Sequence, residues 1–305
     1  MSRAFLILAL AAFSQAGGAG AADSPKRAEM DRRIRSAVAR FPGTVGLFAK
    51  NLTTGETYSI AADERVRTAS TIKLPVMVEV FTQVAAGKAR WDETIELKQD
   101  DEVSGSGVLT EFSPGMRFAI RDLVHLMIVV SDNTATNLLL DRVTTDAVNA
   151  RMDALGFPQT RVLRKVLGDG ATLRPPSGIS AAGRIEENKQ FGLGVSTPRE
   201  MVLLLEKIDR GEVAGPEDSR EMIEILKRQQ YKDGIGRRLG ETPVASKSGA
   251  LDRLRSDVGI VYAPKGKLAI AITCDGLSET DYSPDNAANI FIANLTRMLM
   301  EGLLP

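Results

Sequence analysis

Two groups of strand-like segments, one near each end of the chain, limit the folds that these 305 residues can adopt. The segments are rich in apolar residues, are bounded by turn residues, and comprise 45–50 and 57–60 at the start and 243–248, 257–263 and 268–274 at the end. The residues between the two groups have mainly helical spacing. Because a sheet must bury a face against another layer, this order predicts an α+β fold, with a single antiparallel β-sheet flanked by helices and an inserted all-helical lobe.

The predicted lobes divide the chain into three stretches. Residues 22–68 and 210–305 are expected to form an α/β lobe, and residues 69–209 a helical lobe. The segment 161–195 has no sustained periodicity and is expected to be a loop, which at this length usually has a function or moves. Helical spacing and helix-start residues predict helices at 26–41, 70–86, 120–130, through 138–140, 145–155, from 198, at 217–229 and at 284–303.

The first 21 residues have the pattern of a signal peptide. Arg3 supplies a positive charge, residues 4–13 form a short apolar run, and residues 19–21 offer a small-residue cleavage site. The apolar run is too short for a stable membrane-spanning anchor, so we expect no transmembrane anchor after processing. An uncleaved anchor or a disordered tail is the alternative. We therefore expect the mature protein, residues 22–305, to be exported and to be periplasmic or secreted.

Composition and charge exclude several classes of function. The chain has 39 basic and 39 acidic residues, which gives no electrostatic case for nucleic-acid binding. His125 and Cys274 are the only histidine and the only cysteine, so we predict no metal site, no intrachain disulfide and no Ser-His-Asp triad. Cys274 is expected in the core, and His125 in the core or at an interface. We expect no cofactor and a monomeric protein.

Ser70 and Lys73 stand three positions apart at the start of the apolar run 74–81, which predicts a buried helix. On a helix, positions i and i+3 share a face, so the Ser70 hydroxyl and the Lys73 amine can meet. A lysine whose pKa is lowered by burial or by other cations can take the serine proton. Free backbone N–H groups at a helix start also attract anionic groups. The pair therefore indicates a candidate nucleophile with its base.

Two further short motifs follow in the chain, Ser131–Asn133 and Lys247–Gly249. A serine and a lysine at this spacing occur by chance about once in a chain of this length, Ser131–Asn133 alone is typical of a helix cap or turn, and Lys247–Gly249 alone is typical of a strand end. Chance explains the ordered set of three poorly. The same three motifs occur together in serine β-lactamases and penicillin-binding proteins.

With these motifs the sequence resembles the class A β-lactamases and their penicillin-binding relatives over nearly all of the mature chain. The resemblance also includes residues 133–140, Ser196–Pro198 before a predicted helix, and Arg255–Ile260 after the third motif. It implies a β-lactamase/transpeptidase-like fold. It also implies that Ser70 attacks the carbonyl of a β-lactam or D-alanyl peptide, with Lys73 as base or proton shuttle.

The resemblance assigns roles to the other motif residues as well. It implies that Ser131 protonates the leaving nitrogen and that Asn133 holds the amide of the substrate side chain. Lys247 would keep a positive field across the cleft, Ser248 would bind the substrate carboxylate, and Ala250 would supply an oxyanion N–H next to that of the nucleophile. Asp132 is expected to be structural, bonding to backbone at the helix break.

The chain departs from the family pattern in the loop after the second motif. Class A β-lactamases carry there a glutamate, within Glu-x-x-x-Asn, that activates the deacylating water. In this chain Val166 falls at the glutamate position, and no Glu-x-x-x-Asn follows. Glu186 and Glu187 could return a carboxylate from another point of the loop, although solvent exposure is the more usual state of glutamate.

Three hypotheses about function therefore stand side by side. The first is a β-lactamase in the broad sense, which is acylated at Ser70 and deacylated with help from a loop carboxylate or Lys73. The second is a penicillin-binding-type D-Ala-D-Ala carboxypeptidase that deacylates slowly. The third is a catalytically weak peptidoglycan-binding or regulatory protein, against which the intact set of motifs argues. The range of β-lactams accepted does not follow from these residues.

Overall fold

The computed structural model describes residues 25–168 and 178–305, so the predicted signal peptide lies outside the described residues. The main sheet has the order β2-β1-β10-β9-β8, and each neighbouring pair is antiparallel. Both ends of the chain thus contribute to one sheet, as the strand pattern predicts. Its strands are β1 (Thr44–Asn51), β2 (Thr57–Ile60), β8 (Val244–Leu251), β9 (Leu254–Ala263) and β10 (Gly266–Asp275).

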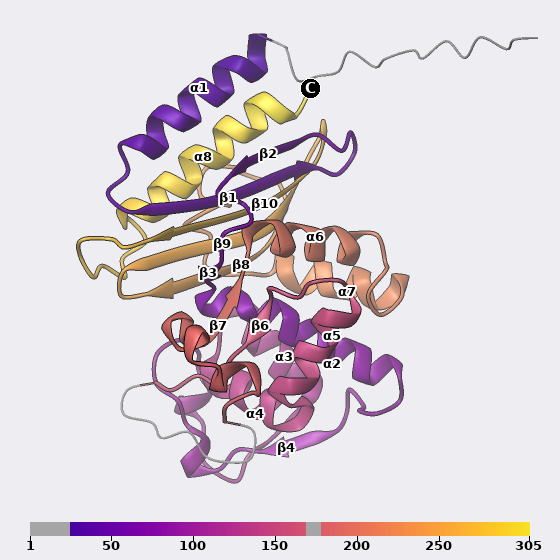
Figure 1. Cartoon of the computed structure of the whole chain (residues 1–305). Helices are drawn as coiled ribbons and strands as arrows, with labels where there is room; N and C mark the ends of the chain where they lie inside the picture. The colour runs from indigo at the N-terminus through magenta and orange to yellow at the C-terminus, as the bar shows by residue number, and fades with distance from the viewer. Residues whose placement is uncertain (1–24, 169–177) are drawn as a thin grey trace, which may run out of the picture.

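One face of this sheet is covered by α1 (Pro25–Ala39) and α8 (Ala287–Leu303), as Figure 1 shows. Residues alternate along β10, so that Ile270, Ile272 and Cys274 face these two helices. The small residues Ala269 and Ala271 belong to the core on the opposite face. Large apolar residues thus fill one layer, while small ones allow the other helices to approach closely. Cys274 is a core residue, as predicted.

The opposite face leads into the helical part of the molecule (Figure 1). The segment α2 is apolar on nearly all sides and fully buried from its start to Phe81, which makes it the centre of this part. Although α6 lies within the predicted helical lobe, it packs against β1, β9 and β10; the division into lobes stays a prediction. The helices are α2 (Lys73–Ala85), α3 (Ile120–Val129), α4 (Asn133–Val143), α5 (Thr145–Ala154), α6 (Pro198–Asp209) and α7 (Pro216–Lys227).

The structure differs from the prediction of a single sheet. A small sheet β3-β7-β6 joins Val66–Arg67, Gly194–Ser196 and Arg161–Val162, and a second one pairs β4 (Thr94–Glu96) with β5 (Arg117–Ala119). The segment 161–195 therefore contains strand residues and short 3₁₀ turns as well as loop. These strands are too short for a period of two to show, and their pairing partners lie far away in the chain.

Two local differences concern the motifs. Ser70 lies in a 3₁₀ turn, Ala69–Ile72, and the α-helix begins only at Lys73. The motif Lys247–Gly249 lies inside β8 rather than at a strand end, because β8 and β9 continue to a tight turn at residues 252 and 253. The closing helix begins three residues later than predicted, at Ala287, with the side chain of Asn286 as its N-cap.

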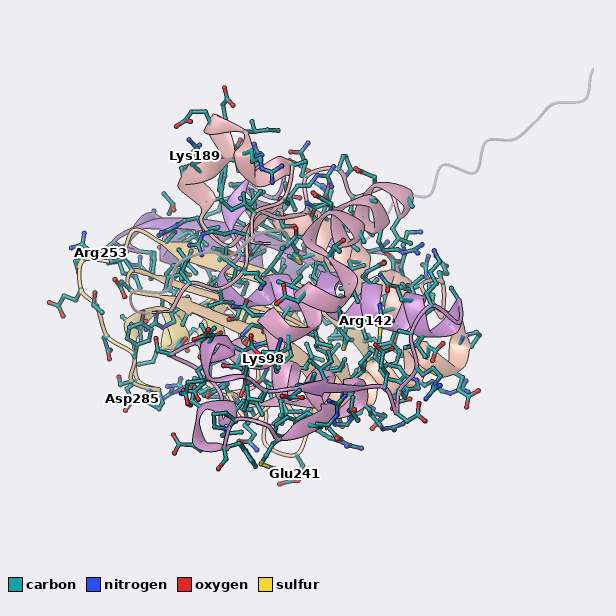
Figure 2. The ribbon with its side chains drawn as sticks, turned by 90° about the horizontal axis from the view of Figure 1, so that it is seen from below. Lys98, Arg142, Lys189, Glu241, Arg253 and Asp285 are labelled. Atoms are coloured by element: carbon teal, nitrogen blue, oxygen red, sulfur yellow. The ribbon has the colours of Figure 1, made fainter. Side chains whose placement is uncertain are left out.

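Charged side chains of both signs project from the edge of the molecule, as Lys189, Glu241, Arg253 and Asp285 illustrate in Figure 2. No helix in the described part of the chain is long and apolar enough to cross a membrane. Within 25–168 and 178–305, no group of three or more His, Cys, Asp or Glu side chains is placed to hold a metal ion.

Candidate active site

Ser70 is presented by a backbone turn in a sparsely populated conformation. The residue before it, Ala69, has a φ of 48°, in the left-handed region that non-glycine residues avoid. Strand β8 passes very close to this turn: a Cβ on Gly249 would lie 2.8 Å from Thr68 O and 3.0 Å from Ser70 N. A side chain at position 249 would therefore separate the nucleophile from β8. Only glycine permits this close approach, which brings the backbone of Ala250 next to Ser70.

Two lysine side chains converge on the hydroxyl of Ser131. Lys73 Nζ donates to Ser131 Oγ at 3.2 Å, and Lys247 Nζ donates to the same atom at 3.1 Å. Lys73 Nζ also donates to Ser131 O at 2.6 Å and to Asn133 Oδ1 at 2.9 Å, and Lys247 Nζ to Ser248 O at 2.8 Å. Ser70 Oγ makes no hydrogen bond within the described residues. The amine of Lys73 thus bonds to the second motif, Ser131–Asn133, and not to Ser70, although Ser70 lies only three positions before Lys73.

The burial of these lysines changes their proton affinity. Both are 0% exposed. Burial first, and the charge of Lys247 second, lower the pKa of Lys73 well below the ordinary lysine value. Burial lowers the pKa of Lys247 to about 7, and Asp257 opposes this shift. Burial therefore favours the neutral form of both amines, and a neutral amine is what a general base requires.

The loop between α3 and α4 is held by Asp132. Its Oδ2 accepts from the backbone N–H groups of Val108 and Leu109, at 2.7 and 2.9 Å, and its Oδ1 caps α4 by accepting from Ala135 N at 2.8 Å. These contacts show that Asp132 bonds to backbone at the helix break, as predicted. Ser131 itself has a φ of 57°, so the chain reverses sharply where its hydroxyl meets the lysines.

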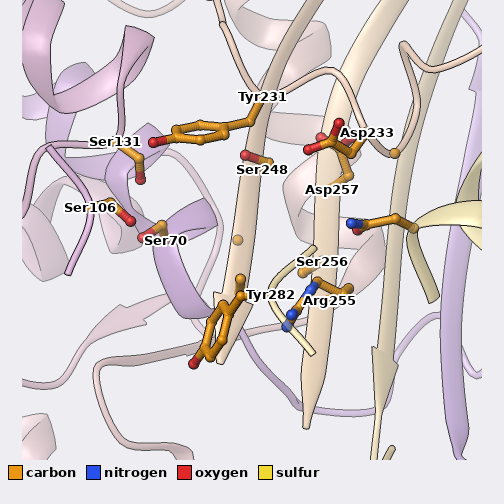
Figure 3. A pocket seen from close by; sticks show the side chains of 14 residues that line it. Ser70, Ser106, Ser131, Tyr231, Asp233, Ser248, Arg255, Ser256, Asp257 and Tyr282 are labelled. Atoms are coloured by element: carbon orange, nitrogen blue, oxygen red, sulfur yellow. The ribbon is translucent and has the colours of Figure 1, made fainter. Parts of the chain in front are cut away.

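A cavity of about 170 Å³ opens over Ser70 and runs across β8 (Figure 3). Of the predicted site residues, Ser70, Ser131, Ser248 and Ala250 line it. Lys73 and Lys247 do not line the cavity, but both contact Ser131, which does. The side chain of Asn133 is held by Lys73 and by Ser104 O, to which its Nδ2 donates at 2.9 Å. The structure thus brings the three sequence motifs together around one hydroxyl pair, Ser70 and Ser131.

The cavity also has lining residues to which the sequence assigned no role, namely Ser106, Tyr231, Asp233, Arg255, Ser256, Asp257, Tyr282 and Asn289. Asp257 is 2% exposed, and burial raises its pKa to about 7. A carboxyl inside an apolar strand pattern was the one available sign of its importance. Tyr231 and Tyr282 are 41% and 61% exposed, and nothing in their local sequence distinguishes them from surface residues.

The loop residues proposed for deacylation do not reach the cavity. Glu186 and Glu187 belong to the short 3₁₀ segment Glu186–Phe191, are both exposed, and are absent from the cavity lining. Lys189 of the same segment points outward in Figure 2. Val166 is half-buried, and its backbone is paired with the side chain of Asn137 on α4. Val166, at the position where the resemblance to class A β-lactamases implies a glutamate, is therefore held next to α4, the helix that follows Ser131.

His125 is half-buried on α3, and burial together with Arg228 lowers its pKa. Its Nε2 is buried and has no hydrogen-bond partner within the described residues. It lines a shallow hollow that is distinct from the Ser70 cavity. A Ser-His-Asp triad is therefore absent from the site, and lysine is the candidate base.

Comparison with known proteins places this geometry in a family. The model of the β-lactamase enzyme family matches residues 29–303. A β-lactamase structure from Sphaerobacter thermophilus is 32% identical, covers 91% of this chain and 98% of its own, and has a TM-score of 0.77. The β-lactamase regulatory protein BlaB of Streptomyces cacaoi is 25% identical over 303 residues, which cover 89% of this chain and 96% of BlaB.

The penicillin-binding branch is also represented. A mutant of PBP-A, solved as an acyl-enzyme complex with penicillin G, superposes with a TM-score of 0.75 at 24% identity and covers 92% of this chain and 98% of its own. This likeness concerns the fold. Together with the family match over residues 29–303 and the 32% identical structure, these findings show that the chain belongs to the β-lactamase enzyme family, the serine hydrolases that share the fold of class A β-lactamases and PBP-A.

Proposed function

We propose that the protein is a serine acyl-enzyme hydrolase that acts on β-lactam amides, with Ser70 as the nucleophile. The observation that carries this proposal is the convergence of Lys73 and Lys247 on Ser131 Oγ, beside the cavity that Ser70 lines. The two cations have no structural reason to share one buried hydroxyl, since their mutual repulsion and desolvation are costly. Proton transfer through Ser131 does explain why both lysines contact its hydroxyl.

The first half of the reaction follows from acyl-transfer chemistry at these residues, and it requires the Lys73 amine, which contacts Ser131 and Asn133, to turn to the Ser70 hydroxyl. Neutral Lys73 takes the proton of Ser70, whose Oγ then bonds to the amide carbonyl carbon. The backbone N–H groups of Ser70 and Ala250 stabilise the negative charge on the carbonyl oxygen. The C–N bond breaks, and the nitrogen takes the proton of Ser131, which Lys73 replaces with the proton from Ser70. The net result is an ester at Ser70, a neutral amine that has gained one proton, and a Lys73 that is neutral again.

The lysine contacts support this route. A charged Lys73 saturates its three N–H groups on Ser131 O, Ser131 Oγ and Asn133 Oδ1. A neutral Lys73 keeps two N–H donors and gains a lone pair. The Ser131 hydroxyl can then donate a hydrogen bond to Lys73 Nζ instead of accepting one. Lys247 continues to donate to Ser131 Oγ, which directs the hydroxyl proton of Ser131 away from it. The charge of Lys247 and the Ser248 hydroxyl are then available for a substrate carboxylate.

Val166 favours a second candidate, a penicillin-binding-type D-Ala-D-Ala carboxypeptidase that deacylates slowly. Hydrolysis of the Ser70 ester needs a water with a base beside it, and Val166 offers none. Glu186 and Glu187 are exposed on a separate segment. Both candidates share the acylation chemistry and differ in the fate of the Ser70 ester. For either, we propose that the mature protein acts outside the cytoplasm, as the signal-peptide pattern of residues 1–21 supports.

Burst kinetics with a chromogenic cephalosporin test the proposal. We expect a stoichiometric burst of cleavage together with a covalent adduct in intact-mass spectrometry. Sustained turnover after the burst supports the hydrolase, and a burst without turnover supports the slow carboxypeptidase. If neither a burst nor an adduct forms, both functions are excluded, and a non-catalytic binding protein becomes the better account.

A further inference from the structure

Tyr231 has a placement that the acylation chemistry does not use. It lines the cavity over Ser70, and its phenol extends from the β8 side toward Ser131 (Figure 3). The residue is 41% exposed, and its hydroxyl makes no hydrogen bond within the described part of the chain. An aromatic ring that stays this exposed over an open cleft contributes less to the fold than a fully buried one.

The start of the segment that carries Tyr231 is fixed to the helix that leads to Ser131. Gln229, which is 1% exposed, donates from Nε2 to Ile128 O at 3.0 Å, and its Oε1 accepts from Tyr231 N at 3.1 Å. Gln230 N donates to Val129 O at 3.1 Å. Because α3 ends at Val129, two residues before Ser131, these bonds set the position of Tyr231 relative to the Ser131 hydroxyl.

The end of the same segment is fixed to β9. The buried Asp257 accepts from Ile235 N through Oδ2 at 2.8 Å. A Cβ on Gly234 would lie 2.5 Å from that oxygen, so the backbone approaches the carboxyl closely. The Ile235 side chain, 1% exposed, anchors the segment in the core beneath the main sheet. Tyr231 thus sits on a short segment that is held at both ends by buried groups.

From this geometry we infer that Tyr231 is a substrate-contacting residue that forms the wall of the leaving-group half of the cleft and favours substrates with a flat, unsaturated or aromatic leaving group. The inference rests on the proposed function, because Ser131 marks the side of Ser70 on which the leaving nitrogen lies. The ring of Tyr231 covers that side. Gln229 and Asp257 act through it as positioning residues.

The experiment compares the acylation rate constants of two substrates. One is a cephalosporin with a conjugated aryl group on its leaving-group side, and the other is benzylpenicillin, which carries only methyl groups there. Aromatic contacts contribute about 0.5–1.5 kcal/mol, which corresponds to a factor of up to about ten. Tyr231→Ala is therefore expected to slow acylation by the aryl cephalosporin about tenfold and by benzylpenicillin less than about twofold, while Tyr231→Phe keeps both rates.

Two controls separate this contact from general effects. Ile185→Ala removes an exposed apolar side chain on a different segment and should change neither rate. Gln229→Ala, which removes the acceptor for Tyr231 N, should produce the same substrate-selective loss as Tyr231→Ala, without a further loss in the double variant. A merely structural role of Gln229 would lower both rates alike.

The outcomes are distinguishable. Equal losses on both substrates, no loss with Tyr231→Ala, or a Tyr231→Phe variant as impaired as Tyr231→Ala would each overturn the assignment, while acylation of the wild-type protein would still support the proposed function. Absence of any acylation of the wild-type protein by either compound would overturn both.

Discussion

The side chain of Asn137 holds both backbone polar groups of Val166. Its Nδ2 donates to Val166 O at 2.9 Å, and its Oδ1 accepts from Val166 N at 2.9 Å. This pairing fixes the course of the loop beside α4 whatever the side chain at position 166 is. The chain therefore holds in place the backbone position at which its resemblance to class A β-lactamases implies a glutamate, and it has valine there.

Val166→Glu is expected to accelerate hydrolysis of the acyl-enzyme. The Val166 side chain packs against the apolar core and is absent from the cavity lining, so the longer glutamate side chain must extend past this core to place a base beside the attacking water. General-base catalysis typically contributes about 10²–10⁴-fold. The decay of the benzylpenicilloyl adduct, followed by intact-mass spectrometry, measures the effect. Val166→Gln, which has the same shape without the base, is the matched control. Equal decay of the two variants would show that position 166 does not face the ester.

Ser70→Ala should abolish the covalent adduct with benzylpenicillin. The reason is that Ser70 stands at the Gly249 crossing, where its own backbone N–H and that of Ala250 can stabilise the oxyanion. Ser106→Ala, a change to another serine that lines the same cavity, should leave the adduct in place. An adduct of unchanged mass on the Ser70→Ala protein would contradict the mechanism.

Glu187→Gln should alter deacylation by less than about twofold. Glu187 is exposed and lies outside the cavity lining, so its charge is screened by water and has no route to the ester. Glu186→Gln serves as the neighbouring control. A loss of turnover of about a hundredfold in the Glu187 variant, which is the scale of general-base removal, would mean that this segment moves onto the cleft.

Acylation by carboxylate-bearing β-lactams should slow as the pH rises above about 7. Burial lowers the pKa of Lys247 to about 7, so above this pH the amine loses the charge that attracts the substrate carboxylate. Arginine stays protonated, and Lys247→Arg should therefore remove the alkaline limb of the profile. A penicillin methyl ester, which has no carboxylate, should show no such limb. A rate that keeps rising to pH 9 with the free acid would refute this role of Lys247.

The raised pKa of Asp257 also predicts how stability depends on pH. Asp257 binds its proton with a pKa of about 7 in the folded state, against 3.8 for the unfolded chain. The native state therefore holds more protons between these values, and the contribution of Asp257 to the free energy of unfolding falls as the pH rises from about 4 to 7. The free energies of unfolding of the wild type and of Asp257→Asn, measured with urea, should diverge in this window. Their difference should change by about 1.4 kcal/mol per pH unit. Parallel curves would contradict it.

Gly249→Ala should lower the acylation rate by about tenfold or more. The added Cβ would lie 2.8 Å from Thr68 O, a clash that typically costs about 1–3 kcal/mol and moves β8 away from the Ser70 turn. The two oxyanion N–H groups then separate, and loss of one such donor typically costs about 10²–10³-fold. Stopped-flow acylation together with a thermal melt measures both effects. An unchanged acylation rate would show that the crossing of β8 does not set the oxyanion site.

Residue patterns alone predicted the order of the long elements and the three motifs. The amphipathic spacing of α1, the apolar run of α2 and the turns between the last strands are local properties, so they are visible in a single segment. The ordered motifs predicted one shared site, but the predicted contact between Ser70 and Lys73 is not formed, because the amine of Lys73 bonds to Ser131 and Asn133 instead. The predicted roles of Asn133, Lys247, Ser248 and Ala250 stay predictions, as do the lobe boundaries, the signal peptide and the monomeric state.

Tertiary structure decided what depends on distant segments. Strand β8 crosses the 3₁₀ turn at Ser70 through Gly249, which lies 179 residues later in the chain. The amine of Lys73 is directed to Ser131 because the loop held by Asp132 places acceptors around it. Asp257 and Tyr231 become part of the site because the segment that follows α7 in the chain packs against β9. Local periodicity records which face of an element is buried, whereas these contacts arise from the approach of backbones that are far apart in the chain.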